Sequence, residues 1–324
     1  MASGNAAKAQ LGIETVYGTI APGEVQVRIS SEGFKYSPNK KEEGLLTGGK
    51  ATGRSYTMGV KAEGSLSTNL RPDEAGYWLG LGLGDEGTPA LEDGSTGAYK
   101  HTFTAIGTAE SDHLPSSTFI IDRVVDVFSY PGCKITDFSF SASPGDYLKL
   151  DANFAGKSEE DGTLNGALSP STLKPLRFQH AVVKLAGNTI ADITSIKFNY
   201  NNNPEQDLQT SSTGLYYKEP EAGARSCTMD LEVLYTVTTE ALKSYLKSDA
   251  DLSVEIAFTS EEEIETGFPY SLTITVPHAQ INSSDANVSG ANILRQTLNL
   301  IAIEDSPDEF ITVELINDRA TAYI

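Results

Sequence analysis

Two glycine-rich stretches have the spacing of nucleotide-binding loops, but both lack the context that such loops need. Gly44, Gly49 and Lys50 are spaced as in a phosphate-binding loop, where backbone N–H groups and a lysine hold phosphate oxygens. Ala51 stands where a Ser or Thr should reach Mg²⁺, and the stretch leads into a strand pattern instead of a helix. "GLGDEG", Gly82–Gly87, matches G-x-G-x-x-G but follows a helical pattern, so we predict a helix end and a loop there.

Metal-binding and nucleophilic patterns are also missing. The four histidines show no H-x-H or H-E-x-x-H spacing, and we expect ordinary strand-end or surface roles for His101, His113, His180 and His278. Cys133 and Cys227 lie far apart, and no G-x-S-x-G elbow occurs. The acidic stretches 158–162 and 259–267 lack the ligand spacing of a calcium loop. We therefore predict no catalytic residue, no cofactor and no metal, and we do not expect an enzyme.

The charge balance limits the class of partner. The chain has 44 acidic and 24 basic residues, a net charge of -20, which argues against tight binding to nucleic-acid backbones by clustered Lys and Arg. No apolar run reaches the ~18 residues of a membrane span, and "MASGNAAKAQ" lacks the pattern of a secretory signal. With two cysteines the chain fits a reducing compartment. These features predict a soluble protein without membrane contact.

The elements that would have to position any site are mostly strands. Apolar residues alternate with polar ones along 56–70 and 227–237, and in shorter runs at 25–29, 138–140, 148–154, 272–276 and 311–315. Helical spacing occurs in "RPDEAGYWLGLGL", with Pro72, Asp73 and Glu74 suited to a first turn. It occurs again in "TTEALKSYLKS", with Thr238 or Thr239 as N-cap. The chain is predicted to be mainly β and antiparallel.

A repeated order of elements predicts two tandem units. Arg-Ser-x-Thr-Met stands at Arg54–Met58 and at Arg225–Met229, each time followed by a helical pattern, a strand with proline and a closing strand. The spacing is 171 positions at the motif (225 − 54) and 146 at the proline (277 − 131), which places an insert at Gly84–Lys100. We predict an N-terminal arm at 1–23, a first β domain at 24–156, a linker at 157–176 and a second β domain at 177–324.

These segments resemble the tail tube (major tail) proteins of long-tailed bacteriophages. The likeness is carried by "GIETVYGT", by "GRSYTMGVKAEGSLSTNLRPDEAGYWLGLGLG" and "YPGCKITDFSFSASPGDYLKLDANFAGK", and in the second copy by "FQHAVVKLAGNTIADITSIKFNYNNNPE", "GARSCTMDLEVLYT", "YSLTITVPHAQINSSDANVSG" and "ITVELIND". It extends from about Gly12 to the C-terminus. The segments form a pattern of strands without a catalytic signature.

The resemblance implies a structural protein of the virion. Its fold would be two tandem tail-tube-type β-sandwich or barrel units, each with one flanking α-helix. Sheets of neighbouring units would join into rings, here trimers with pseudo-sixfold symmetry, that stack into a tube in the bacterial host cytoplasm. Its partners would be copies of itself and the tail terminator, tape measure and distal tail proteins, and DNA would pass through during ejection without sequence-specific binding.

Simple geometry allows such a conduit. With about four strands from each of six units, ~24 strands close into a barrel ~48 Å across at the backbone, wider than a DNA duplex of ~20 Å. From the net charge of -20 we predict a channel lined by Asp and Glu, which would repel phosphates.

The long loops at 37–53 and 201–223 exceed the length of tight hairpins, and we predict ring-to-ring stacking for them. The arm at 1–23 and the C-terminal "NDRATAYI" would assist. The candidate interface residues are Lys40, Lys41, Glu42, Glu43, Leu45, Leu46, Lys50, Asn201, Asn202, Asn203, Glu205, Tyr216 and Tyr217.

Two other readings of the sequence stay open. A bacteriocin or secretion-system tube protein would share the ring architecture. A monomeric two-domain β-sandwich that binds glycans would use clustered surface aromatics, for which the 14 tyrosines leave room.

Overall fold

The structure is a computed structural model that describes residues 3–44, 53–107, 112–208, 214–288, 293–304 and 310–324. The strands of the N-terminal half are β1 (Lys8–Ile13), β2 (Val25–Val27), β3 (Ser31–Glu32), β4 (Lys35–Glu42), β5 (Ser55–Asn69), β6 (Gly84–Glu86), β7 (Ala90–Leu91), β8 (Tyr99–Ala105), β9 (Ser117–Asp122), β10 (Val127–Ala142), β11 (Lys149–Gly156) and β12 (Glu160–Asp161). Those of the C-terminal half are β13 (Ala181–Leu185), β14 (Asn188–Ile190), β15 (Ile193–Asn201), β16 (Ser226–Leu234), β17 (Leu252–Glu265), β18 (Phe268–Asp285), β19 (Arg295–Ala302) and β20 (Thr312–Asn317). The α-helices are α1 (Ala75–Leu83), α2 (Val237–Ala241) and α3 (Lys243–Ser248), with short 3₁₀ turns at Gly4–Ala6 and Phe178–His180. The expected mainly β fold is confirmed.

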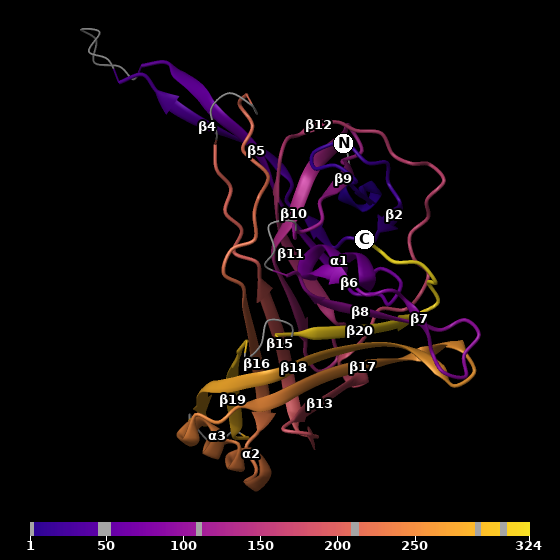
Figure 1. Ribbon diagram of the computed structural model, residues 1–324, viewed down its shortest axis with the longest axis vertical. Coiled ribbons are helices and arrows are strands. Elements are labelled where there is room, and N and C mark those ends of the chain that lie inside the picture. Colours follow the sequence, from indigo (N-terminus) through magenta and orange to yellow (C-terminus); the bar gives the residue numbers. More distant parts are fainter. Residues whose placement is uncertain (1–2, 45–52, 108–111, 209–213, 289–292, 305–309) are drawn as a thin grey trace.

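One antiparallel sheet runs through both halves of the chain (Figure 1). Its strand order is β4–β5–β11–β10–β15–β16–β19–β18, and the short β3 continues β4 along β5. The β10–β15 pair joins the halves. We call this sheet of eight strands the long sheet.

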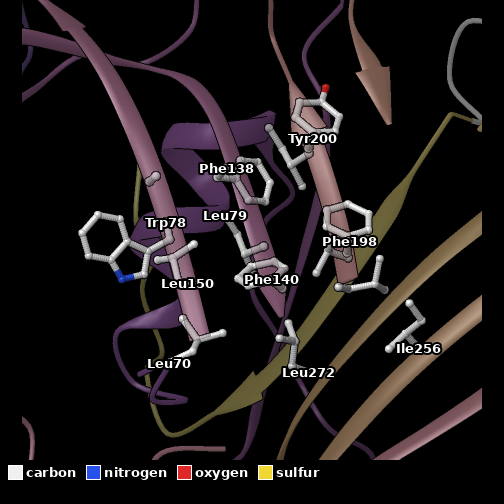
Figure 2. Close-up of a cluster of buried hydrophobic side chains, with 14 of the residues drawn as sticks. Leu70, Trp78, Leu79, Phe138, Phe140, Leu150, Phe198, Tyr200, Ile256 and Leu272 are labelled. Atoms are coloured by element: carbon white, nitrogen blue, oxygen red, sulfur yellow. The ribbon is translucent and has the colours of Figure 1, made fainter. Parts of the chain in front are cut away.

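One face of the long sheet is apolar, as the period-2 pattern predicts. The strand registers align two buried rows across it: Leu66, Ala152, Phe138, Tyr200 and Cys227, and next to them Thr68, Leu150, Phe140, Phe198, Met229 and Leu300. The rings of Phe138, Phe140, Phe198 and Tyr200 pack together at the β10–β15 pair, with Leu79 of α1 close by (Figure 2). Burial of such aromatic side chains contributes roughly 2–3 kcal/mol each to folding.

Helix α1 lies against this apolar row because its residues are small or apolar all round. All nine residues from Ala75 to Leu83 are buried, and Gly82 leaves room for the ring of Phe138. The helix ends at Gly84, which takes the left-handed conformation at φ 93°, so the predicted helix end at "GLGDEG" is confirmed. The predicted loop after it was wrong, because Gly84–Glu86 form β6, which pairs with β8. The second predicted helix forms as α2 and α3, but its N-cap is Thr236, whose hydroxyl accepts from the N–H of Thr239.

Two strands are long enough to serve in two sets of pairings. β10 pairs with β9 in its first part and with β11 and β15 in its second, and β18 pairs with β17 and β20 before it pairs with β19. The change falls near Pro131 in β10 and near Pro277 in β18, where the registers are interrupted. β1 connects β9 to β2, just as β13 connects β17 to β14.

The register irregularities of the two halves recur at a constant spacing. β10–β11 is interrupted between Ile135 and Asp137, and β18–β19 between Ile281 and Ser283, both 146 positions later (281 − 135, 283 − 137). Phe138 faces Ala152 and Ser284 faces Leu298 at the same spacing. The prolines of the bends are also 146 positions apart.

The Arg-Ser-x-Thr-Met motif does not mark equivalent positions. Leu66 faces Ala152 and Leu231 faces Leu298, so the registers relate β5 to β16 by 165 positions (231 − 66) and not by the 171 of the motif. The reason is that β5 extends further into its hairpin than β16 does. Met58 is therefore 44% exposed on the hairpin, whereas Met229 is fully buried in the sheet.

Several segments outside the long sheet are tied to the N-terminal half. Lys8–Ile13, within the predicted arm, forms β1, and Ala9 and Leu11 are fully buried. Within 157–176, β12 pairs with β10 and the side chain of Asn165 donates to the Gly23 carbonyl. The predicted insert contains β6 and β7, which pair with β8, and β8 in turn pairs with β20 of the C-terminal half.

One buried carboxyl makes stability depend on pH. Burial, together with the neighbouring Asp73, raises the pKa of Glu74 to about 8, and the residue is only 2% exposed. The folded state thus holds a proton that the unfolded chain releases near its ordinary pKa, so the free energy of unfolding falls as pH rises from about 4.5 to 8. We expect Glu74→Gln to remove this component and to be more stable than wild type at pH 8 by about 4 kcal/mol, with little difference at pH 4.5. Urea unfolding at both pH values measures this difference in the free energy of unfolding. If that free energy changed equally with pH in the wild type and the variant, the prediction would be contradicted.

Candidate functional site

The face of the long sheet opposite the apolar rows is polar. Its side chains align in three rows: Ser65, Asn153, Asp137, Asn201 and Ser226; then Ser67, Asp151, Ser139, Asn199 and Thr228; then Asn69, Lys149, Ser141, Lys197, Asp230 and Asn299. All are exposed or half-buried. We call these residues the polar rows; they cross the β10–β15 pair without a break.

The charges of the polar rows are few and nearly balanced. Of the sixteen residues three are aspartates and two are lysines. Each aspartate accepts a hydrogen bond from a neighbouring strand: Asp137 from Asn153 at 2.7 Å, Asp230 from Asn299 at 2.7 Å, and Asp151 from the Ser67 hydroxyl. Within the polar rows, hydroxyl and amide groups therefore outnumber the carboxylates, and the acid-lined channel of the assembled tube stays a prediction.

The β4–β5 hairpin projects from the end of the long sheet, and the second predicted stacking loop runs beside it (Figure 1). The Val60 N–H donates to the Leu215 carbonyl at 2.7 Å, and the Asn39 amide donates to the Tyr217 hydroxyl at 3.2 Å. The ammonium of Lys61 lies 5.8 Å from the centre of the Tyr217 ring. The structure thus brings together two loops that the sequence separates by about 150 residues.

A buried lysine anchors this second loop. Lys134 of β10 is 1% exposed, and its Nζ lies 2.6 Å from Glu219 Oε1 and donates to the Pro220 carbonyl at 3.3 Å. The ring of Tyr17 lies 5.8 Å from the same Nζ. Because the Lys134 ammonium is buried, losing its Glu219 partner, whose side chain is 30% exposed, would leave an unpaired buried charge, so these contacts hold the loop on the N-terminal half.

The candidate interface residues fall into three groups. Lys40, Lys41, Glu42 and Glu43 are exposed on or just after β4, and Asn201, Asn203, Glu205 and Tyr216 are exposed around the second loop. Tyr217 is half-buried against β5, and Asn202 is fully buried because its amide donates to the carbonyls of Gly82 and Ile135. Asn202 therefore makes its contacts within the chain. Leu45, Leu46 and Lys50 lie outside the described residues, as does most of the stretch with phosphate-loop spacing.

The comparison with protein families decides the class of protein. A family model described as "Phage tail tube protein" matches residues 4–302. The chain belongs to the phage tail tube protein family. The comparison with curated proteins gives no match. As a tail tube protein the chain is a structural component of the virion, from a family that is not one of enzymes.

Within the described part of this tail tube protein, neither a metal-ligand cluster nor a membrane-spanning helix is found. No group of three or more His, Cys, Asp or Glu is placed to hold a metal ion within the described residues. None of the described helices has the length and apolar character needed to cross a bilayer. The candidate functional surfaces of the tail tube protein are therefore the polar rows, the β4–β5 hairpin with its neighbouring loop, and the two outer strands of the long sheet.

The sequence-based expectation of a strand-end or surface position was wrong for His101 of the tail tube protein. His101 is fully buried, with Nδ1 2.8 Å from Glu86 Oε1 and Nε2 donating to the Arg319 carbonyl at 2.9 Å. Tyr323 is 3% exposed and packs edge-on against Tyr77 at 4.9 Å between ring centres. Tyr323 thus holds the C-terminal segment against α1 within the chain, and the assisting role of this segment in stacking stays a prediction. The sequence did contain an indication that His101 is buried: it alternates with Tyr99 and Phe103, and so lies on the same face of β8 as these aromatic residues.

Proposed function

We propose that the chain self-assembles into rings that stack as the tube of a phage tail and form the conduit for DNA. The observation that carries the proposal is the long sheet itself: one face buried, one face polar, and outer strands that can pair further. An open sheet of this length exposes backbone donors and acceptors at its edges, and closure by neighbouring copies would satisfy them.

The proposed ring is a trimer. The repeated pairing order, the recurring register irregularity and the constant spacing of 146 support two tandem copies of one unit within the chain, so three chains would give pseudo-sixfold symmetry. Eight strands from each of three chains make ~24 strands, which close at a diameter of ~48 Å at typical strand spacing and tilt.

The polar rows would face the channel in this arrangement. Their Ser, Thr and Asn side chains, with aspartates engaged by neighbours, offer a sliding phosphate backbone neither a cluster of cations nor a strong repulsive field. DNA would pass without sequence-specific contacts. Assembly in the bacterial host cytoplasm, with tail terminator, tape measure and distal tail proteins at the ends and inside, belongs to the same proposal.

The hairpin and its neighbouring loop would contact the next ring. They project from the sheet, carry exposed charges of both signs at Lys40, Lys41, Glu42 and Glu43, and are fixed to one another by backbone hydrogen bonds. Opposite charges on stacked rings can set register at modest energetic gain.

Negative-stain electron microscopy of the purified chain at high concentration tests the proposal. We expect tubes or stacked rings with a central hole, and a variant lacking residues 40–50 should form rings that do not stack. Particles of single chains at every concentration would contradict self-assembly. Normal tubes from the deletion variant would contradict the stacking role alone.

A further inference from the structure

The contact between the two halves of the chain is a template for a contact between chains. Along β10–β15, Phe138 faces Tyr200, Ser139 faces Asn199 and Asp137 faces Asn201. Tyr200 is fully buried there, with its ring centre 5.4 Å from that of Phe138.

β10 and β15 form the contact between the halves. The strand of the C-terminal half that corresponds to β10, and the strand of the N-terminal half that corresponds to β15, each have an edge with which no described strand pairs. In the C-terminal half, β18 pairs with β19 over Ala279–Asp285, while its pairings with β17 and β20 end at Ala279 and Thr275. In the N-terminal half, β4 pairs only with β5 among the described strands. The two outer strands of the long sheet are therefore β18 and β4.

The strand registers give the equivalent residues. β10 corresponds to β18 at the spacing of 146, so Phe138 corresponds to Ser284. Leu66 of β5 corresponds to Leu231 of β16. Because Glu32 faces Leu66 and Ile196 faces Leu231, Glu32 corresponds to Ile196, and β3–β4 corresponds to β15 at a spacing of 164 (196 − 32). The sequence agrees, because Phe34-Lys35-Tyr36 then aligns with Phe198-Asn199-Tyr200.

We propose that β18 of one chain pairs antiparallel with β4 of a second copy of this chain, with Ser284 opposite Tyr36, Asp285 opposite Lys35 and Ser283 opposite Ser37. The inference rests on the proposed function and specifies its lateral interface. The occupant of both outer strands is the same molecule, so the pairing repeats around the ring until it closes.

The side chains at these positions complement one another. Asp285 is exposed and the Lys35 side chain is 65% exposed, so an opposite-charge pair forms across the two strands on the polar side of the sheet. Tyr36 is 45% exposed, whereas its equivalent Tyr200 is fully buried. Ser284 stands where the template has Phe138 and is 7% exposed, with its hydroxyl accepting from the Gln296 amide at 2.7 Å, so the smaller side chain faces the Tyr36 ring across the proposed pair.

A disulfide cross-link tests the register. The variant Ser37→Cys with Ser283→Cys places two thiols at directly opposed positions, where Cβ separations of ~4.5–5.5 Å allow bridging after small adjustments. Cys133 and Cys227 are buried and leave the background low. We expect oxidation to yield covalent trimers on denaturing gels. The matched control, Lys41→Cys with Ser283→Cys, lies four residues or ~13 Å further along β4 and should stay monomeric.

Charge reversal gives a second, reversible test. Lys35→Asp or Asp285→Lys alone should reduce ring formation at least tenfold at low salt, and the double variant should restore it. Wild-type rings without the Ser37–Ser283 cross-link, or with cross-linking only in the control, would overturn the pairing and leave the tube proposal standing. A wild-type chain that forms neither rings nor cross-links would overturn both.

Discussion

Phe138→Ala should destabilise the chain by about 3–5 kcal/mol, because it removes a buried ring at the pair of strands that joins the halves. The centre of the Phe138 ring lies 5.5, 6.1 and 5.4 Å from the ring centres of Phe140, Phe198 and Tyr200, respectively. The Phe138 ring also fills the space beside Gly82 of α1. The cavity cannot close easily, since strands hydrogen-bonded on both sides hold the backbone. Urea unfolding followed by far-UV circular dichroism measures the loss as a lower midpoint at unchanged slope.

The neighbouring residue supplies the control for this variant. Ser139 lies on the same strand but points to the polar face, so Ser139→Ala should change the free energy of unfolding by less than about 0.5 kcal/mol. If the two variants lost equal stability, the apolar row would not be the core that joins the halves. A Phe138→Leu variant should recover most of the loss, since it restores much of the buried volume.

The strands were predictable because apolar and polar residues alternate along each half-buried strand. Alternation at Cys227, Met229 and Leu231 indicated one buried face, and the structure places all three in the sheet as expected. Local composition also located both helices. The register between strands was not predictable from the Arg-Ser-x-Thr-Met motif. Met58 and Met229 share the motif, yet Met58 is exposed on the hairpin and Met229 lies in a buried row of the sheet. Long-range pairing depends on the fit of whole strands, and a five-residue match carries too little of that information.

The candidate site was only partly predictable. Loop length drew attention to residues 37–53 and 201–223, whose stacking role stays a prediction. The loop prediction was wrong for the initial part of the first range, because residues up to Glu42 form β4. The contact of the hairpin with the second loop through Val60 and Leu215 uses backbone atoms, which leave no mark in the sequence. The buried Lys134 was missed for a related reason: its partner Glu219 is 85 positions away, so no local pattern pairs them. Net charge was a poor guide to the polar rows, because it averages over the whole surface.

Glu86→Leu should cost about 3–5 kcal/mol and release the C-terminal segment, because one buried carboxyl group is hydrogen-bonded to three groups of the chain. Glu86 Oε1 lies 2.8 Å from His101 Nδ1, and its Oε2 accepts from the N–H groups of Tyr323 at 2.6 Å and Ile324 at 3.2 Å. The side chains of Glu86 and His101 are fully buried, so leucine would leave His101 Nδ1 and the two N–H groups without their carboxyl partner, while His101 Nε2 keeps the Arg319 carbonyl. Urea unfolding measures the loss, and faster digestion by carboxypeptidase reports release of the segment.

Two further variants separate the role of the carboxylate from that of the surface around it. Asp85→Ala, one residue away on the exposed side of β6, should change stability by less than about 1 kcal/mol, because its hydrogen bond from Thr104 is exposed. Glu86→Gln keeps an acceptor for the C-terminal N–H groups and should lose less than the leucine variant. Since β8 pairs with β20 and Tyr323 packs against Tyr77 of α1, the segment ties the end of the C-terminal half to α1 and β8 of the N-terminal half. Resistance to carboxypeptidase in Glu86→Leu equal to wild type would show that ring packing of Tyr323 against Tyr77 suffices to hold it.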